Sequence, residues 1–232
     1  MILEHGICGN ASELGYVSEA CLREYNNSES SKTRNQESAS SSLLVHSAVC
    51  NEGRLSLDGI ENGGLRLANE INNVIRGVAI DKHKQNNNDE RVTTTIALSI
   101  VGNSMGGLYG RYALKYIKFF FTLQADEVGS TNTTVAVDVL VVPNVFVTTA
   151  TPHLGIKNMT YWKVPEFLEP VGAWMFGKSS NDLFRRRNKI KKANNANNAN
   201  NANNYNDIIE QLAFDPEFIT PLSKFKRRIA YA

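Results

Sequence analysis

The segment from Ile96 to Ile117, IALSIVGNSMGGLYGRYALKYI, constrains the fold more than any other part of the chain. Its first six residues are almost continuously apolar, as in a central parallel strand that is covered on both faces. Farther on, large apolar or aromatic residues recur every four positions, which is helical spacing. These residues are Leu108, Tyr112, Tyr116 and Phe120. The segment therefore predicts a buried strand, a sharp turn and a helix.

The turn between them carries the candidate nucleophile, Ser104. Gly102-Asn103-Ser104-Met105-Gly106 fits the G-x-S-x-G pattern, in which a strained strand-to-helix elbow exposes a serine hydroxyl. The flanking glycines allow the turn to pack against its neighbours. A serine that only caps the helix N-terminus is the alternative interpretation. A phosphate-binding loop is excluded because no lysine follows Gly107 at the required spacing.

Composition and charge exclude several function classes. The 232 residues suffice for one domain, and 25 basic residues are nearly matched by 23 acidic ones, so a nucleic-acid partner is not predicted. Three cysteines without metal-ligand spacing favour neither a disulfide framework nor a zinc site. We interpret Cys8, Cys21 and Cys50 as small buried or half-buried thiols, and we predict no metal and no cofactor. The sequence shows no signal peptide and no membrane-spanning run, which favours a chain that is cytoplasmic or peripheral to an intracellular membrane.

Strands and helices are expected to alternate along the chain. Expected strands cover residues 1–3, 43–49, 96–101, 134–142 and 144–149, and a final strand begins near Arg228. The segments 134–142 and 144–149 are either two strands or one strand broken at Pro143. Expected helices cover residues 11–25, 64–78 and 208–214, besides the helix after Ser104, and residues 58–60 form a turn. This alternation predicts an α/β fold.

Three polar segments interrupt what we expect to be a single domain over residues 1–232. They cover 26–42, 82–91 and 185–206, and contain too little apolar surface to form a core. A further segment holds Trp162, Phe167, Leu168, Trp174, Met175 and Phe176. It is either a core-facing helix or an apolar cap over a site for acyl chains.

Five stretches together resemble a known family. They are HGICGN, SAVCNEGRLSLDGIENGGLRLANEI, VGNSMGGLYGRYALKYI, FVTTATPHLGI and FKRRIAYA. In this order they resemble the serine esterase or lipase family catalogued as domain of unknown function 676, in the α/β-hydrolase superfamily. The resemblance covers most of the chain and leaves out mainly the polar segments. It implies an α/β-hydrolase-type, mostly parallel sheet flanked by helices.

The resemblance also implies a reaction, the hydrolysis of esters through an acyl-enzyme on Ser104. The backbone N–H groups of Met105 and Ile7 would form the oxyanion hole, and His5 would order the loop that carries Ile7. The implied substrates are lipid or other acyl esters, such as acylglycerols or phospholipids, and contact with a membrane or a lipid droplet would fit them. No cofactor is implied.

The rest of a catalytic triad is harder to place. In this fold the acid and then the histidine follow the serine, and the only histidine after Ser104 is His153. His153 is either the base, with Asp126 or Asp138 as its acid, or part of a structural loop in TPHLG. In the similar family, an Asp and a His follow the segment that resembles RRIAYA. Because the chain ends at Ala232, we expect the acid, the base and the C-terminal strands and helix to be missing, and hydrolysis to be weak.

Two other functions remain open from the sequence. One is a catalytically silent α/β-hydrolase-like domain that binds lipid or protein. The other is an acyltransferase, which shares the chemistry up to the acyl-enzyme.

Overall fold

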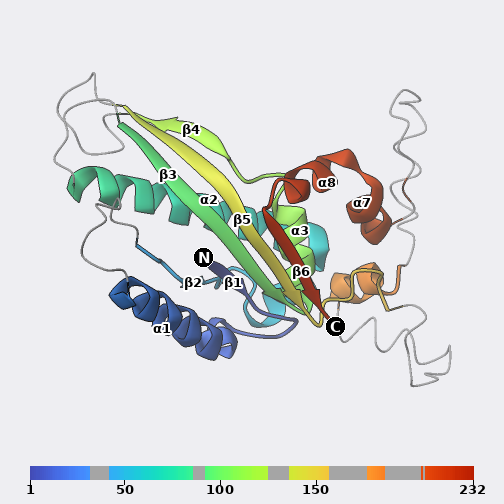
Figure 1. The fold of residues 1–232 in the computed structure, drawn as a ribbon. Helices are drawn as coiled ribbons and strands as arrows, with labels where there is room; N and C mark the ends of the chain where they lie inside the picture. Colours follow the sequence, from blue (N-terminus) through green and yellow to red (C-terminus); the bar gives the residue numbers. More distant parts are fainter. Residues whose placement is uncertain (32–41, 86–91, 125–135, 157–176, 186–204, 206) are drawn as a thin grey trace, which may run out of the picture.

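A mixed β-sheet, six-stranded within the described residues, forms the centre of this computed structural model (Figure 1). The structure describes residues 1–31, 42–85, 92–124, 136–156, 177–185, 205 and 207–232. The strands run in the order β2 (His46–Ser47), β1 (Ile2–Glu4), β3 (Val92–Asn103), β5 (Val137–Thr149) and β4 (Phe120–Leu123), and β6 (Arg227–Tyr231) also pairs with β5. All of these pairs are parallel except that of β4 with β5. This mostly parallel sheet with flanking helices confirms the predicted α/β fold.

The carboxyl ends of four parallel strands meet at one edge of the sheet. Glu4 at the end of β1 lies opposite Gly102 of β3. Thr149 at the end of β5 lies opposite both Asn103 of β3 and Tyr231 of β6. The loops that follow these strands therefore converge, which is where open α/β sheets bind their ligands.

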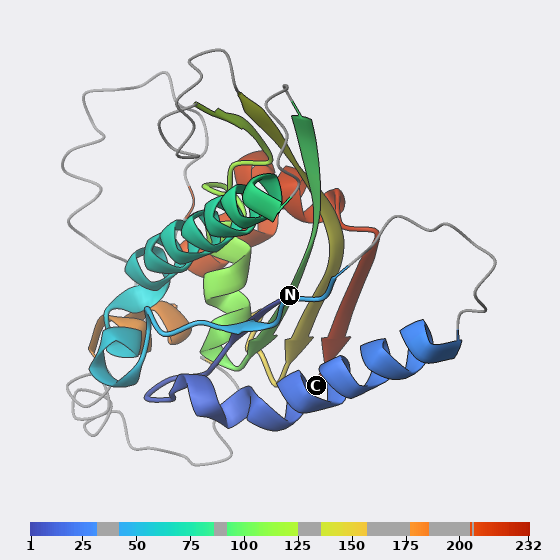
Figure 2. The ribbon, with the colours of Figure 1, turned by 90° about the vertical axis from the view of Figure 1, so that its left-hand side faces the viewer.

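Helices cover both faces of the sheet. Figure 2 shows α1 (Gly15–Ser31), which follows a 3₁₀ turn at Ala11–Leu14, on one face, and α2 (Gly59–Gln85) and α3 (Met105–Ala113) on the other. The last helices, α7 (Ile208–Phe214) and α8 (Pro216–Ser223), lie near α3, where the rings of Phe218 and Tyr112 are 5.0 Å apart. Residues 177–183 form a further short helix. None of the described helices is both long enough and apolar enough to cross a membrane.

The apolar stripe predicted for α2 is confirmed. Leu67, Ile71 and Ile75 are buried in the core, and Val74 packs against it. Four-residue spacing places these side chains on one face of the helix, toward the sheet and α3.

The expected helix after Ser104 is shorter than predicted, and this part of the interpretation was wrong. Helix α3 ends at Ala113, and Phe120–Leu123 is the antiparallel strand β4. Phe119 and Phe121 pack against the core whereas Phe120 is 63% exposed. Leu108 and Tyr112 are buried on α3 as the helical spacing predicted. The alternation at Phe120 has the period of a strand, so the continuation of the four-residue spacing to Phe120 was a coincidence.

Several other boundaries differ from those expected. The turn predicted at residues 58–60 contains the first residues of α2, which begins at Gly59. Helices α1 and α2 continue through residues 31 and 85, into the starts of two predicted polar insertions. Strand β2 is only two residues long. Residues 134–149 contribute one strand, β5, whose pairing with β3 shifts between Leu98 and Ile100, near Pro143.

Some predictions fall outside the described residues. These include the apolar segment with Trp162, most of the three polar insertions, and Asp126. The extent of a single domain over residues 1–232 stays a prediction.

Candidate functional site

Ser104 occupies a strained elbow between β3 and α3. Its backbone has φ 52° and ψ −122°, a conformation that few residues other than glycine adopt. Such a conformation costs on the order of 1–3 kcal/mol and persists only where the surrounding structure imposes it. The Ser104 N–H contributes to this by donating to the Thr149 carbonyl at 2.8 Å. Within the described residues, no side chain is hydrogen-bonded to Ser104 Oγ.

The glycines around Ser104 are required by close packing. A Cβ on Gly102 would lie 2.5 Å from the Gly107 nitrogen, and a Cβ on Gly106 would lie 2.5 Å from the His5 carbonyl oxygen. A Cβ on Gly107 would collide with the side chain of Thr151. The elbow is thus fitted between the loops that follow β1 and β5.

The loop after β1 approaches the elbow through Gly6. A Cβ on Gly6 would lie 3.0 Å from the Ser104 Cβ and 3.5 Å from its Oγ. The buried His5 ring bonds through Nδ1 to the Gly6 carbonyl at 2.9 Å. A carbonyl only accepts, so Nδ1 carries the proton, and His5 orders this loop as the sequence suggested.

Two backbone N–H groups at this junction have no hydrogen-bond acceptor among the described residues. One belongs to Ile7, in the loop after β1, and the other to Met105, the first residue of α3. The first N–H groups of a helix lack intrahelical acceptors and favour negative charge. They are the two groups that the family resemblance implies as the donors of an oxyanion hole, a role that stays a prediction.

His153 lies close to this edge of the sheet but faces other partners. Its Nε2 is 2.9 Å from Thr148 Oγ1, and its Nδ1 is 3.3 Å from Arg111 Nη1. Burial, and then the positive charge of Arg111, lower the pKa of His153. Within the described part of the chain no hydrogen bond joins His153 to Ser104 or to a carboxylate, so the structure does not bring the predicted base and nucleophile together.

Asp138 is not near enough to be the acid of such a triad. It lies in the first half of β5, where it accepts a hydrogen bond from Thr122 Oγ1 at 2.7 Å. The strand continues to Thr149, and at about 3.3 Å per residue Asp138 lies roughly 35 Å from Thr149. Asp138 therefore cannot orient His153.

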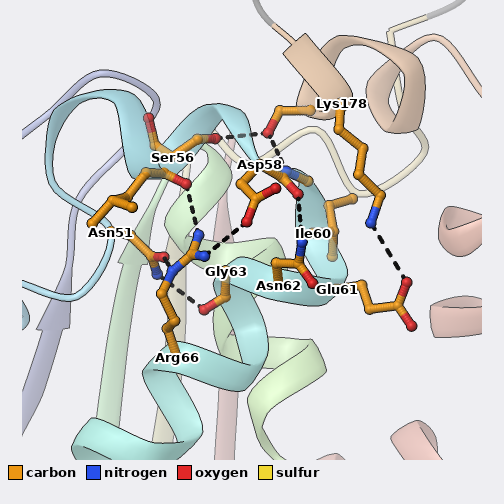
Figure 3. Close-up of polar contacts among 12 residues, drawn as sticks. Asn51, Ser56, Asp58, Ile60, Glu61, Asn62, Gly63, Arg66 and Lys178 are labelled. Carbon is orange, nitrogen blue, oxygen red and sulfur yellow. Dashed lines mark hydrogen bonds and ion pairs between the residues drawn. The ribbon is translucent and has the colours of Figure 1, made fainter.

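The sequence interpretation missed a buried polar network behind the loop after β1. Glu4 is fully buried, and its Oε1 accepts a hydrogen bond from Asn51 Nδ2 at 2.9 Å. The Asn51 Oδ1 accepts from Arg66, which also pairs with Asp58 at 2.9 Å (Figure 3). Burial raises the pKa of Glu4 to about 8. The sequence contained one sign of this network, the glutamate at the end of the apolar run MILE. A glutamate in a central strand is buried and therefore needs polar partners.

The same region is tied to the loop after β1 through Ser56. Ser56 Oγ accepts a hydrogen bond from the Cys8 N–H at 2.7 Å. Cys8 itself is exposed, contrary to the prediction of a buried or half-buried thiol. It lies at the tip of a turn, where its side chain has no core to enter.

Comparison with known protein families identifies the class. Residues 1–232 match the model of the family described as putative serine esterase (DUF676), and the chain belongs to this family. At that level it is a serine hydrolase with an α/β-hydrolase-type fold. Comparisons with curated proteins and with solved structures found no match.

Proposed function

We propose that the chain hydrolyses carboxylic esters through an acyl-enzyme formed on Ser104. The observation that carries this proposal is the position of the serine. It sits at φ 52° on the elbow after β3, with Gly6 of the neighbouring loop against its side chain. A helix cap would not require this strain, because N-cap residues normally have extended backbone and accept a hydrogen bond from the helix. Ser104 makes no such side-chain bond.

The proposed reaction has two steps. Ser104 Oγ attacks the ester carbonyl carbon and gives its proton to a general base, and the carbon–oxygen bond to the alcohol then breaks as the alcohol takes up a proton. Water next attacks the acyl carbon and gives a proton to the same base, the bond from this carbon to Oγ breaks as Oγ takes up that proton, and the acid is released. In both steps the carbonyl oxygen becomes negative, and the N–H groups of Ile7 and Met105 would stabilise it.

We further propose lipid esters, acylglycerols or phospholipids, as the substrates. The family resemblance supports this choice, as does an exposed apolar side chain on one of the loops that converge at the site. Leu154, in the loop after β5, is 75% exposed. This side chain would face acyl chains delivered from a membrane or lipid-droplet surface.

The second candidate is a catalytically silent domain that binds lipid or protein. The engagement of both ring nitrogens of His153 by Thr148 and Arg111 favours it, because a base so placed does not activate Ser104. The two candidates share the fold and differ in the reactivity of Ser104.

Hydrolysis by a Ser104→Ala variant tests the first proposal. Short-chain p-nitrophenyl esters and diacylglycerol in phosphatidylcholine vesicles would be compared, with Ser12→Ala, at an exposed serine of the 3₁₀ turn before α1, as a matched control. We expect Ser104→Ala to abolish both reactions and to leave the thermal midpoint unchanged, while Ser12→Ala remains active. Equal rates in all three proteins would remove Ser104 from the mechanism, and activity on the short esters alone would overturn the choice of lipid.

A further inference from the structure

The loop that carries Ile7 is a tight turn with an unfavourable residue in it. The Gly9 N–H donates to the Gly6 carbonyl at 3.2 Å, which makes Ile7 and Cys8 the two central residues of a β-turn. Cys8 has φ 56°, whereas Ile7 is not among the residues with positive φ. A positive φ at the second central position alone defines a type II turn, in which this position is normally glycine. Something outside the turn must therefore hold Cys8 in place.

The Ser56 hydroxyl is placed to hold it. Ser56 Oγ accepts from the Cys8 N–H at 2.7 Å and donates to the Gly53 carbonyl at 2.6 Å, so its orientation is fixed. Type I and type II turns differ by a flip of the peptide between the two central residues. In the type I arrangement, the Cys8 N–H would point away from Ser56, and this hydrogen bond would be lost. Ser56 therefore favours type II.

Ser56 is itself held by two other parts of the fold. Its carbonyl accepts from the Tyr109 hydroxyl of α3 at 2.6 Å and from Ser179 Oγ at 2.7 Å. Figure 3 shows Ser56 before the first turn of α2, beside the segment that carries Lys178. The Gly53 N–H adds a second tie to the loop after β1 by donating to the Gly9 carbonyl at 2.9 Å. The hydroxyl is thus fixed relative to the elbow helix.

We propose that Ser56 is a positioning residue for the oxyanion hole. By accepting from the Cys8 N–H, Ser56 anchors this turn, and so fixes the position of the Ile7 N–H beside Ser104. This inference rests on the proposed function, since the direction of the Ile7 N–H matters for catalysis only if that group binds the oxyanion. Ser56 does not touch the substrate and acts through the turn.

The first test compares Ser56→Ala with two matched controls. Removal of one oxyanion donor costs about 100- to 1,000-fold in kcat, so a misdirected donor should cost roughly 10- to 100-fold, with little change in KM. Ser179→Ala and Tyr109→Phe each remove a hydrogen bond to the Ser56 carbonyl and leave the contact between Ser56 Oγ and Cys8. We expect each of them to lower kcat by much less than Ser56→Ala, because Ser56 Oγ keeps its bonds to the Cys8 N–H and the Gly53 carbonyl. Equal losses in all three variants would show general loosening and overturn the proposal.

The second test is a rescue that a merely structural role would not produce. Glycine adopts positive φ without strain, so Cys8→Gly should keep the type II turn even without the Ser56 hydroxyl. We expect the double variant Cys8→Gly, Ser56→Ala to recover most of the kcat lost in Ser56→Ala. A double variant as slow as Ser56→Ala would contradict the proposed route through the turn.

Hydrogen exchange separates failure of this inference from failure of the proposed function. The Cys8 amide should exchange slowly in the parent protein and at least tenfold faster in Ser56→Ala, whatever the activity. If the parent shows no hydrolysis that depends on Ser104, the proposed function fails, and the catalytic role of Ser56 fails with it. In that case hydrogen exchange at Cys8 still shows whether Ser56 holds the turn. If hydrolysis depends on Ser104 but Ser56→Ala changes neither exchange nor kcat, only the present inference fails.

Discussion

Gly6 and Ser104 lie so close together that a Cβ on Gly6 would reach to 3.0 Å from the Ser104 Cβ. The contact joins the loop after β1 to the elbow after β3, at the edge of the sheet where their strands end. It leaves no room for a side chain beside the serine hydroxyl. The φ of Gly6 is not in the left-handed region, so its backbone conformation does not require glycine. Glycine is required here because a side chain would fill the space beside the nucleophile.

Gly6→Ala should reduce activity more than stability. The added methyl group would push the loop and the Ile7 N–H away from Ser104, and we expect kcat to fall at least about tenfold. Steady-state hydrolysis and thermal melting would be measured side by side. The matched control is Gly15→Ala, because a Cβ on Gly15 would meet nothing within 4 Å. An unchanged kcat in Gly6→Ala would show that the loop does not line the reaction site.

Two glycines of α2 should respond to alanine in opposite directions. A Cβ on Gly64 would lie 2.6 Å from the Tyr112 Cβ, so Gly64→Ala should separate α2 from α3 and cost about 1–3 kcal/mol of unfolding free energy. A Cβ on Gly77 would meet nothing within 4 Å, so Gly77→Ala should stabilise the helix by about 0.5–1 kcal/mol. Urea unfolding measures both. Equal effects would mean that the two helices do not pack through Gly64.

The buried Glu4 should make the protein less stable as the pH rises. Burial raises its pKa from 4.5 to about 8, so the folded state keeps a proton that the unfolded chain releases. Its contribution to stability is fully present below about pH 4.5 and is lost as the pH rises through about 8. Glu4→Gln keeps an oxygen for the Asn51 amide and removes this titration, so its thermal midpoint should fall less between pH 5 and pH 9. The exposed Glu24→Gln should follow the parent, and an identical slope in Glu4→Gln would show that Glu4 is not the source.

His153→Ala should destabilise the protein without abolishing hydrolysis that depends on Ser104. The ring bridges Thr148 of β5 and Arg111 of α3, so its removal takes away the hydrogen bond of the buried Thr148 hydroxyl. The thermal midpoint and kcat would be measured together. Complete loss of activity in a folded His153→Ala protein would instead identify His153 as the general base.

The sequence predicted those features that depend on local pattern. The elbow follows from the apolar strand, the glycines and Ser104, and the buried face of α2 follows from the spacing of Leu67, Ile71 and Ile75. Local spacing was wrong at Phe120, where pairing of β4 with β5 outweighs a helical repeat. The role of Ser56 could not be predicted, because its partners Cys8 and Tyr109 meet it only after the sheet has formed.

Reaction with a fluorophosphonate probe, followed by mass spectrometry of the digested protein, shows whether Ser104 is an activated nucleophile. The probe forms a covalent bond to an activated serine oxygen and needs no knowledge of the natural substrate. We expect one adduct, on the peptide that contains Ser104, which is absent from Ser104→Ala and formed more slowly in Gly6→Ala. An unmodified Ser104 in the folded protein, or equal labelling of Ser104→Ala at another serine, would show that Ser104 is not the activated nucleophile.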